Sequence, residues 1–219
     1  SKFGKNNKYA FFPSAGLAWN ITQEDFMSDQ NTISNLKLHT SYGLTGNSEI
    51  DTYRSLARVS SGTLLINDIR APYSYISSMA NPDLKWESTA MLNIGLDFSL
   101  FNGRLGGTIE WYDKRTSDML YTYKVPTPPY VYDRMQANVG DMKNTGIEVL
   151  LNLDVIRNKT FNWNMSLNLS HNKNEITKLS SDLYTTDRIY TGDPWIRGAS
   201  GVTSHVVEEG RPVGQFFML

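Results

Sequence analysis

The chain contains no cysteine among its 219 residues. This excludes a disulfide framework and any metal site built on thiolates. A surplus of charge is also missing, because 21 Lys and Arg residues stand against 22 Asp and Glu residues. Proteins that bind nucleic acid usually carry a basic excess, so nucleic acid is not an expected partner.

Long apolar runs are absent as well. No stretch approaches the roughly 20 apolar residues that a membrane-spanning helix needs, and the mean hydropathy is −0.40. Such a value is usual for a soluble protein. A membrane-spanning strand is the exception, because it needs only about 10 residues and turns half of them toward a polar lumen.

Motifs for catalysis and for metal or cofactor binding are missing from the sequence. The three histidines, His39, His171 and His205, are scattered and show no zinc-ligand spacing. The densest carboxylates lie in loop-like sequence, where solvated charge explains them better than a glycosidase pair does: Glu49, Asp51, Glu208 and Glu209. The sequence therefore predicts no catalytic, cofactor-binding or metal-binding residue, and we do not expect an enzyme.

What the sequence does contain is a strict alternation of apolar and polar residues. Residues 92–101 and 104–112 alternate with a period of two on either side of Asn102-Gly103. A period of two indicates a half-buried strand and cannot keep one face of a helix apolar. Asn-Gly favours a tight hairpin, since both residues tolerate positive φ in a type I′ turn.

The same pattern returns at 147–156 and 161–170, around the polar segment 157–160. Weaker strand patterns precede it, and Pro13 predicts a bulge or an edge in the first of them because it lacks an N–H donor. We expect a short helix at 22–28, with Thr22 as its cap and Asp25 in a capping-box-like position. The predicted strands are 9–20, 36–43, 89–101, 104–117, 145–156 and 161–173.

The connections between these strands are unequal. Tight turns alternate with the long segments 44–88, 118–144 and 174–219, which are rich in Gly, Pro, Asn, Ser and Tyr. Short turns at one end and long loops at the other are typical of outer-membrane β-barrels. A soluble β-sandwich that binds carbohydrate also has alternating strands. The two architectures differ in whether the Leu/Ile/Val/Trp face contacts lipid or a second sheet.

Aromatic residues near the expected strand ends suit either architecture. Rings with a polar tip favour the boundary between lipid and water, but they also occur in sandwich cores. The rings concerned are Trp19, Tyr42, Phe101, Trp111, Tyr112, Phe161 and Trp163.

Seven segments together resemble one family, the SusC/RagA-type TonB-dependent outer-membrane transporters of Bacteroidetes. They include Phe-Pro-Ser-Ala-Gly-Leu-Ala-Trp at 12–19 and Asn-Pro-Asp-Leu-Lys-Trp-Glu at 81–87. The others are 33–47, 93–98, 112–120, 138–148 and 209–217. They span nearly the whole chain in the family's order.

The resemblance implies an all-β fold of antiparallel up-and-down hairpins, forming part of a transmembrane barrel in the cell outer membrane. It also implies uptake of oligosaccharide or peptide, energised through TonB, with a SusD-like lipoprotein as lid and lipid around the barrel. No cofactor is implied. We see no TonB box, plug domain or closing strand, so we expect 1–219 to be one incomplete barrel domain.

The long loops hold the rings that we expect to contact cargo or the lid. Sugars stack on flat rings and peptides pack on them, although the same rings can hold loops folded. The five candidates are Tyr75, Trp86, Tyr130, Tyr132 and Trp195. Tyr73 and Tyr190 are further loop rings of the same kind.

Overall fold

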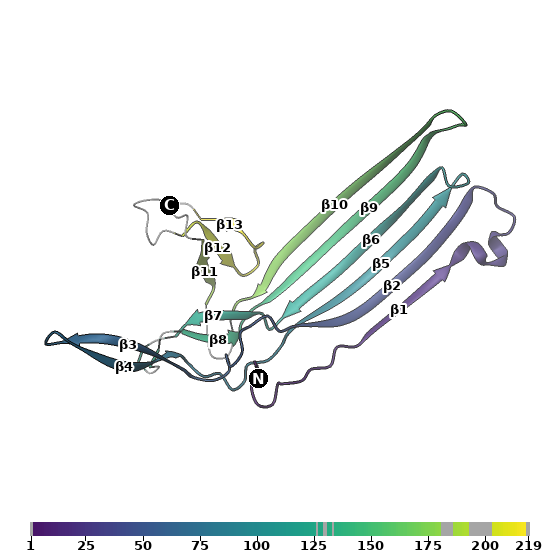
Figure 1. Ribbon diagram of the computed structural model, residues 1–219. Helices are drawn as coiled ribbons and strands as arrows, with labels where there is room; N and C mark the ends of the chain where they lie inside the picture. Colours follow the sequence, from purple (N-terminus) through teal and green to yellow (C-terminus); the bar gives the residue numbers. More distant parts are fainter. Residues whose placement is uncertain are drawn as a thin grey trace.

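A computed structural model describes residues 2–125, 127–128, 131–132, 134–180, 186–192 and 203–217. Its main element is one six-stranded antiparallel sheet, in which each strand pairs with the next one of the sheet along the chain (Figure 1). The strands are β1 (Ser14–Asn20), β2 (Ile33–Asn47), β5 (Glu87–Leu100), β6 (Leu105–Ser117), β9 (Asp141–Arg157) and β10 (Asn162–Lys178). The predicted up-and-down order is therefore confirmed, with most strands longer than predicted.

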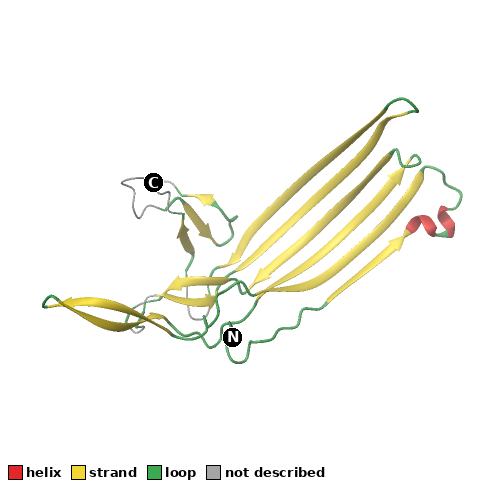
Figure 2. Ribbon diagram, viewed as in Figure 1, coloured by secondary structure: helices red, strands yellow, loops and turns green. Residues whose placement is uncertain are grey.

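Three smaller sheets lie at one end of the main sheet, and the tight turns lie at the other (Figure 2). They consist of β3 (Arg58–Ile66) with β4 (Ile69–Ser78), β7 (Leu120–Lys124) with β8 (Arg134–Asn138), and β11 (Arg188–Thr191), β12 (His205–Glu208) and β13 (Gln215–Phe216). All three occur within segments expected to be long loops. The predicted division into a turn end and a loop end is confirmed.

The hairpin between β5 and β6 turns where Asn102-Gly103 predicts it. Asn102 has a φ of 55° and Gly103 a φ of 83°, and the Arg104 N–H donates to the Phe101 carbonyl at 3.3 Å. Positive φ at both central residues is the hallmark of a type I′ turn. Phe101 also has positive φ, 55°, and its N–H donates to the Thr32 carbonyl of the neighbouring connection at 2.8 Å.

The short helix predicted at 22–28 is wrong. Two 3₁₀ turns occupy this segment, η1 (Ile21–Gln23) and η2 (Asp25–Met27), and neither has a side-chain cap. Thr22 lies inside η1, and its hydroxyl accepts a hydrogen bond from the Leu36 N–H at 3.3 Å instead. A helix of this length is marginal without an apolar face packed on the protein, and η1 and η2 bury no residue. No helix with the length and apolar character of a membrane span occurs in the described residues.

Proline decides where the first strand begins. The strand predicted at 9–20 starts only at Ser14, because Pro13 has no N–H to continue the ladder. The Pro13 carbonyl still accepts from the Leu44 N–H at 2.9 Å. The sequence did contain a signal for the unpredicted β3–β4 hairpin: Asn67 and Asp68 follow Ile66 and turn with φ of 51° and 63°.

One face of the main sheet is apolar and has no protein over it within the described ranges. The register aligns Leu38, Leu96, Ile109, Val149 and Leu169 in a single cross-strand row. Leu169 is 55% exposed and Leu38 and Ile109 are each 38% exposed, while Leu96 and Val149 are half-buried. A sandwich would bury such a face beneath a second sheet, so the sandwich alternative does not fit this structure.

The opposite face of the main sheet is polar. His39 lies 3.7 Å from Asp97, and the Thr108 hydroxyl donates to the same carboxylate at 2.9 Å. Glu110 and Glu148 sit directly opposite each other on β6 and β9. Two like charges in direct register destabilise a sheet unless water screens them, so this face is suited to an aqueous lumen.

At the loop end, the edge of the apolar face does not follow one cross-strand row. Leu44, Ala90, Arg115 and Lys143 occupy one cross-strand row, yet the row is apolar on β2 and β5 and charged on β6 and β9. A horizontal membrane boundary crosses the register in this way when the strands are tilted. Barrel strands tilt by about 35–45° from the membrane normal.

Arginine substitutions on adjacent residues test the two faces. Leu151→Arg and Leu167→Arg place a cation on the apolar face, where Leu151 and Leu167 pair directly. At mid-bilayer this costs about 2–4 kcal/mol, so we expect the full-length protein to lose its heat-modifiable, assembled form on gels of membrane fractions. Asn152→Arg and Asn168→Arg face the polar side and are expected to assemble. Equal loss in both pairs contradicts the face assignment.

Candidate functional site at the loop end

The segment 81–87 connects the loops to one another. The Asn81 side chain, which is almost fully buried, donates to the Gln136 carbonyl of β8 at 2.9 Å. Its backbone N–H donates to the Ser55 carbonyl at 3.1 Å. Asn81 therefore links the first long loop to the second.

Asn138 completes this connection from the other side. Its amide nitrogen donates to the Lys85 carbonyl at 2.8 Å and to the Asp118 carbonyl at 2.9 Å. Its amide oxygen accepts from the Lys85 N–H at 2.9 Å, and the Lys85 ammonium lies 2.7 Å from the Asp118 carboxylate. One side chain thus satisfies backbone groups of two loops that have no ladder partners.

The segment before β1 packs on the same element. The Gly4 N–H donates to the carbonyl of Leu84, a fully buried residue, at 2.9 Å, and the Ser55 hydroxyl donates to the Phe3 carbonyl at 3.1 Å. A Cβ at Gly4 would lie 1.7 Å from the Pro82 carbonyl oxygen. Only glycine allows the two backbones to approach so closely.

Trp86 lies within this packing. Its ring stacks on Phe3 at 4.9 Å between centroids and meets Phe12 edge-on at 5.8 Å. Its indole N–H is buried without a hydrogen-bond partner among the described residues. Both neighbours belong to the segment before β1, so this candidate ring takes part in holding the loops together.

Of the other candidate rings, the structure describes Tyr75 and Tyr132. Tyr75 stacks on Tyr73 of the same strand, at 5.6 Å between centroids with 27° between planes, and these rings remain 44% and 40% exposed. Tyr132 is partly buried beside β8. Tyr130 and Trp195 lie outside the described residues. Among the candidates in the described ranges, Trp86 and Tyr75 each pack on other rings and not on each other.

Tyr190 belongs to the small sheet at the end of the chain. Its ring meets Phe217 at 5.0 Å between centroids. Its hydrogen bond with Arg188, reinforced by Glu208, raises the pKa of that guanidinium above its usual value. These contacts bind β11 to its neighbours.

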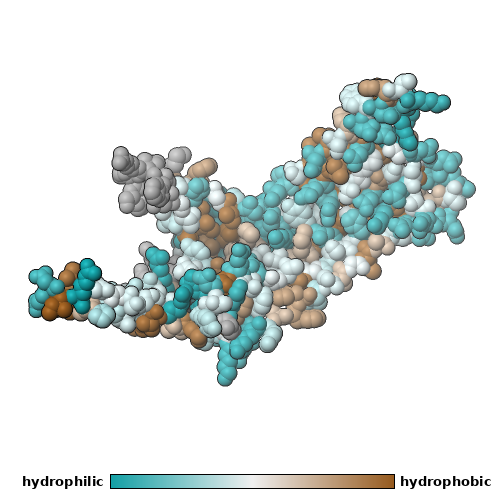
Figure 3. Space-filling view, in the orientation of Figure 1, coloured by the Kyte–Doolittle hydropathy of each residue, from teal (hydrophilic) through white to brown (hydrophobic). Residues whose placement is uncertain are grey.

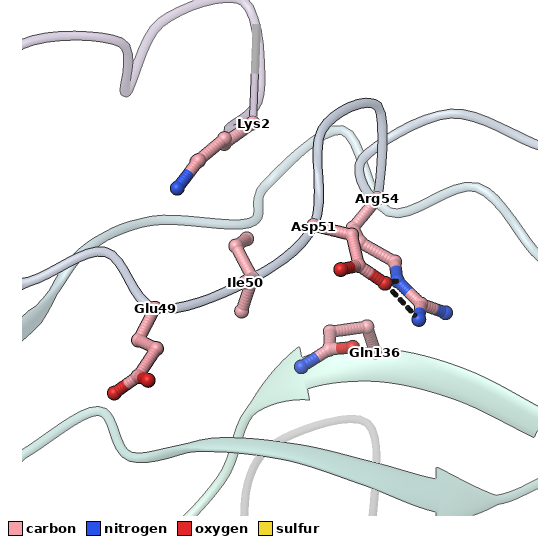
Figure 4. Close-up of a pocket in the computed structure, with 6 residues that line it drawn as sticks. All are labelled: Lys2, Glu49, Ile50, Asp51, Arg54 and Gln136. Carbon is pink, nitrogen blue, oxygen red and sulfur yellow. Dashed lines mark hydrogen bonds and ion pairs between the residues drawn. The ribbon is translucent and has the colours of Figure 1, made fainter.

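A polar pocket of about 340 Å³ lies between the first loop, the segment before β1 and β8. Its lining consists of Lys2, Glu49, Ile50, Asp51, Arg54 and Gln136. Figure 4 shows Arg54 and Asp51 turned toward each other on one side, with Lys2 and Glu49 on the other. The pocket thus offers both signs of charge and one amide.

The chemistry of this pocket suits binding of a polar ligand. The Arg54 guanidinium engages Asp51 through Nε at 3.1 Å, and the Lys2 ammonium donates to the Ser48 carbonyl at 3.1 Å. With Asp51 held by a cation, Glu49 has no carboxylate partner across a cleft of the kind that glycoside hydrolysis uses. Within the described ranges, no group of three acidic or histidine side chains converges on a possible metal position.

Sequence reasoning singled out Glu49 and Asp51 but missed the other residues of this pocket. Lys2 lies in the segment before β1 and Gln136 lies in β8, far away in the sequence. No local spacing connects them, because the hydrogen bonds of Asn81 and Asn138 bring the segments together.

These features define a class of protein. An antiparallel sheet has an apolar face that no described residue covers, a polar face, tight turns at one end and packed loops at the other. Together these features describe a section of the wall of a membrane β-barrel. Residues 1–203 match the family described as "TonB dependent receptor-like, beta-barrel". The chain belongs to the TonB-dependent receptors and is a section of an outer-membrane barrel of the SusC/RagA type.

Individual relatives cover the whole chain. It is 37% identical to TonB-dependent receptor P3 of Formosa agariphila over 99% of its length, and 34% identical to TonB-dependent receptor SusC of Bacteroides thetaiotaomicron over 100%. In the closed-closed state of the RagAB peptide importer, a chain 34% identical superposes with a TM-score of 0.80 over 99% of this chain. The chain spans 21%, 24% and 22% of these three proteins.

Two substitutions at Trp86 separate packing from ligand contact. Trp86→Phe keeps a six-membered ring between Phe3 and Phe12 and removes the smaller indole ring with an N–H that has no partner among the described residues, so we expect only a small change. Trp86→Ala removes the ring and costs on the order of 3 kcal/mol. The measurement is protease cleavage of segments 2–13 and 81–87 in the full-length receptor, with Tyr73→Ala as an exposed control. Loss of cargo uptake in Trp86→Phe, with protease resistance unchanged, contradicts the packing role.

Proposed function

We propose that the full-length protein containing this section is a TonB-energised outer-membrane importer of oligosaccharide or peptide. In this proposal the chain contributes barrel wall and extracellular loops. One observation carries it: the packed loops gather at a single end of a sheet whose apolar face is uncovered. Such an arrangement suits selective passage, with lipid outside, water and cargo inside, and recognition at the mouth.

We infer that 1–219 is one incomplete barrel domain. In lipid every backbone N–H and C=O needs a partner. Within the described residues, β1 pairs only with β2 and β10 only with β9 in the main sheet. Further strands are therefore needed to pair both edges. This accords with a chain that spans about a fifth of its relatives.

We also propose that the section has no catalytic role. Its relatives are named as receptors and importers. The densest carboxylates in the described loops include Asp51, which is occupied by Arg54.

The lid lipoprotein, in this proposal, contacts the β3–β4 hairpin. This hairpin extends away from the main sheet, and near its tip the surface carries an apolar patch beside hydrophilic residues (Figure 3). Leu65 is 69% exposed and Ile69 is 70% exposed. An isolated two-stranded hairpin is only marginally stable in water, so an apolar tip of this kind favours a protein partner.

The paired rings of Tyr73 and Tyr75 supply a flat exposed surface beside that tip. We propose that they pack on cargo or on the lid. Trp86, Tyr130, Tyr132 and Trp195 stay predictions for cargo or lid contact, with Trp86 the least suited because Phe3 and Phe12 cover its ring.

Removal of the apolar tip tests the lid proposal. Leu65→Asp with Ile69→Asp is expected to reduce co-purification of the lipoprotein with the tagged receptor at least tenfold, since buried apolar anchors dominate interfaces. The matched control is Ser61→Asp with Ser74→Asp, a polar pair in the same hairpin. Unchanged co-purification in the tip variant contradicts this contact.

Uptake measurements test the import function itself. Cells lacking the receptor are expected to lose uptake of labelled oligosaccharide or of labelled peptide, and the cargo that is lost identifies the substrate class. Depleting TonB is expected to abolish the same uptake. Full uptake of both cargoes without the receptor contradicts the proposal.

A further inference from the structure

Three neighbouring strands carry a cation on the outward face just beyond the apolar band. On β6 the first outward polar residue after Trp111 is Asp113, and Arg115 follows it. β9 runs in the opposite direction, so that Lys143 lies next to Thr145 on the outward face toward the loop end. On β10, Lys173 follows His171 in the same way. Each cation thus lies two residues beyond the first polar residue of its own strand.

The three cations lie at a common height when the strand tilt is included. Arg115 and Lys143 share one cross-strand row, while Lys173 lies one row lower, opposite Thr145. The last apolar residue of the outward face also lies one row lower on β10, at Leu169, than on β9, at Ile147. The cations therefore follow the membrane boundary at the loop end, where lipid headgroups begin.

Their charge is accessible and only partly neutralised. The side chains of Arg115, Lys143 and Lys173 are 66%, 40% and 72% exposed. Asp113 lies 2.9 Å from Arg115 and 3.4 Å from Lys143, and Glu175 lies 3.5 Å from Lys173. Three cations thus share two carboxylates.

Asp141, the next acidic residue toward the loop end of β9, is not one of the carboxylates that pair with these three cations. The Asp141 carboxylate accepts a hydrogen bond from the Asp118 N–H at 3.1 Å. It lies at the end of its strand, where the loops begin.

An apolar recess of about 320 Å³ lies beside Asp113 and Arg115, which form part of its lining. Its lining consists of Tyr42, Ala90, Leu92, Trp111, Asp113 and Arg115. Tyr42 of β2 and Trp111 of β6 are 52% and 40% exposed. Ala90 and Leu92 come from β5, which lies between these two strands. The recess is apolar along the strands and charged at its loop-side rim.

We propose that this recess and its cations form a binding site for an anionic lipid of the surrounding membrane. One acyl chain lies against Ala90 and Leu92 between the two rings, and the headgroup phosphate is bound by Arg115 and Lys143. Guanidinium binds phosphate through two parallel hydrogen bonds, and aromatic rings favour the headgroup boundary. The inference rests on the outward orientation of this face and not on the cargo.

Lipid titration of the purified full-length receptor, followed by native mass spectrometry, tests the phosphate contact. The probes are phosphatidylglycerol and phosphatidylcholine with identical acyl chains. We expect Arg115→Gln with Lys143→Gln to weaken phosphatidylglycerol binding about 25-fold, about fivefold for each cation, with phosphatidylcholine binding unchanged. The matched control is Lys114→Gln, a neighbouring cation on the inward face, which is expected to bind both lipids as the parent does.

A second variant tests the recess independently of charge. Ala90→Trp fills the floor of the recess and is expected to displace both lipids while all cations remain. Heat-modifiable migration confirms assembly of every variant before titration. The proposal is overturned if the double variant retains phosphatidylglycerol, if Lys114→Gln loses it equally, or if Ala90→Trp binds both lipids as the parent does.

Discussion

Backbone pairing in a medium without water is the constraint on which this structure depends. The inner strands β5, β6 and β9 pair with a strand on each side over most of their length, as a bilayer requires. The chain meets this requirement by local closure, with each strand followed by a turn that returns the next one beside it. The long connections then lie outside the bilayer, where irregular backbone can pair with side chains such as Asn81 and Asn138.

The main sheet was predictable because its pattern is local. Alternation at 92–101 and 147–156 fixed the strands and their faces, and Asn102-Gly103 fixed a turn. The boundaries were less predictable, since β9 and β10 continue past the apolar band into polar sequence where alternation gives no signal. Thr22 misled for another reason: a capping residue stabilises a short helix only where packing supports it, and η1 and η2 bury no residue.

The loop end was harder to predict because its contacts are distant in sequence. Trp86 looks like an exposed recognition ring, yet its packing partners Phe3 and Phe12 lie more than 70 residues earlier. The pocket likewise combines Lys2 with Gln136. By contrast, the stacking of Tyr73 on Tyr75 follows from the strand period once Asn67-Asp68 is recognised as a turn.

The attachment of the segment before β1 to residues 81–87 has a consequence for the order of folding. The hairpins at the turn end can close one after another, because each joins neighbours in sequence. The loop end cannot settle until residues about 80 positions apart, such as Gly4 and Leu84, have met, and such closures are slow. We therefore expect the mouth of the barrel to acquire its final shape after its wall.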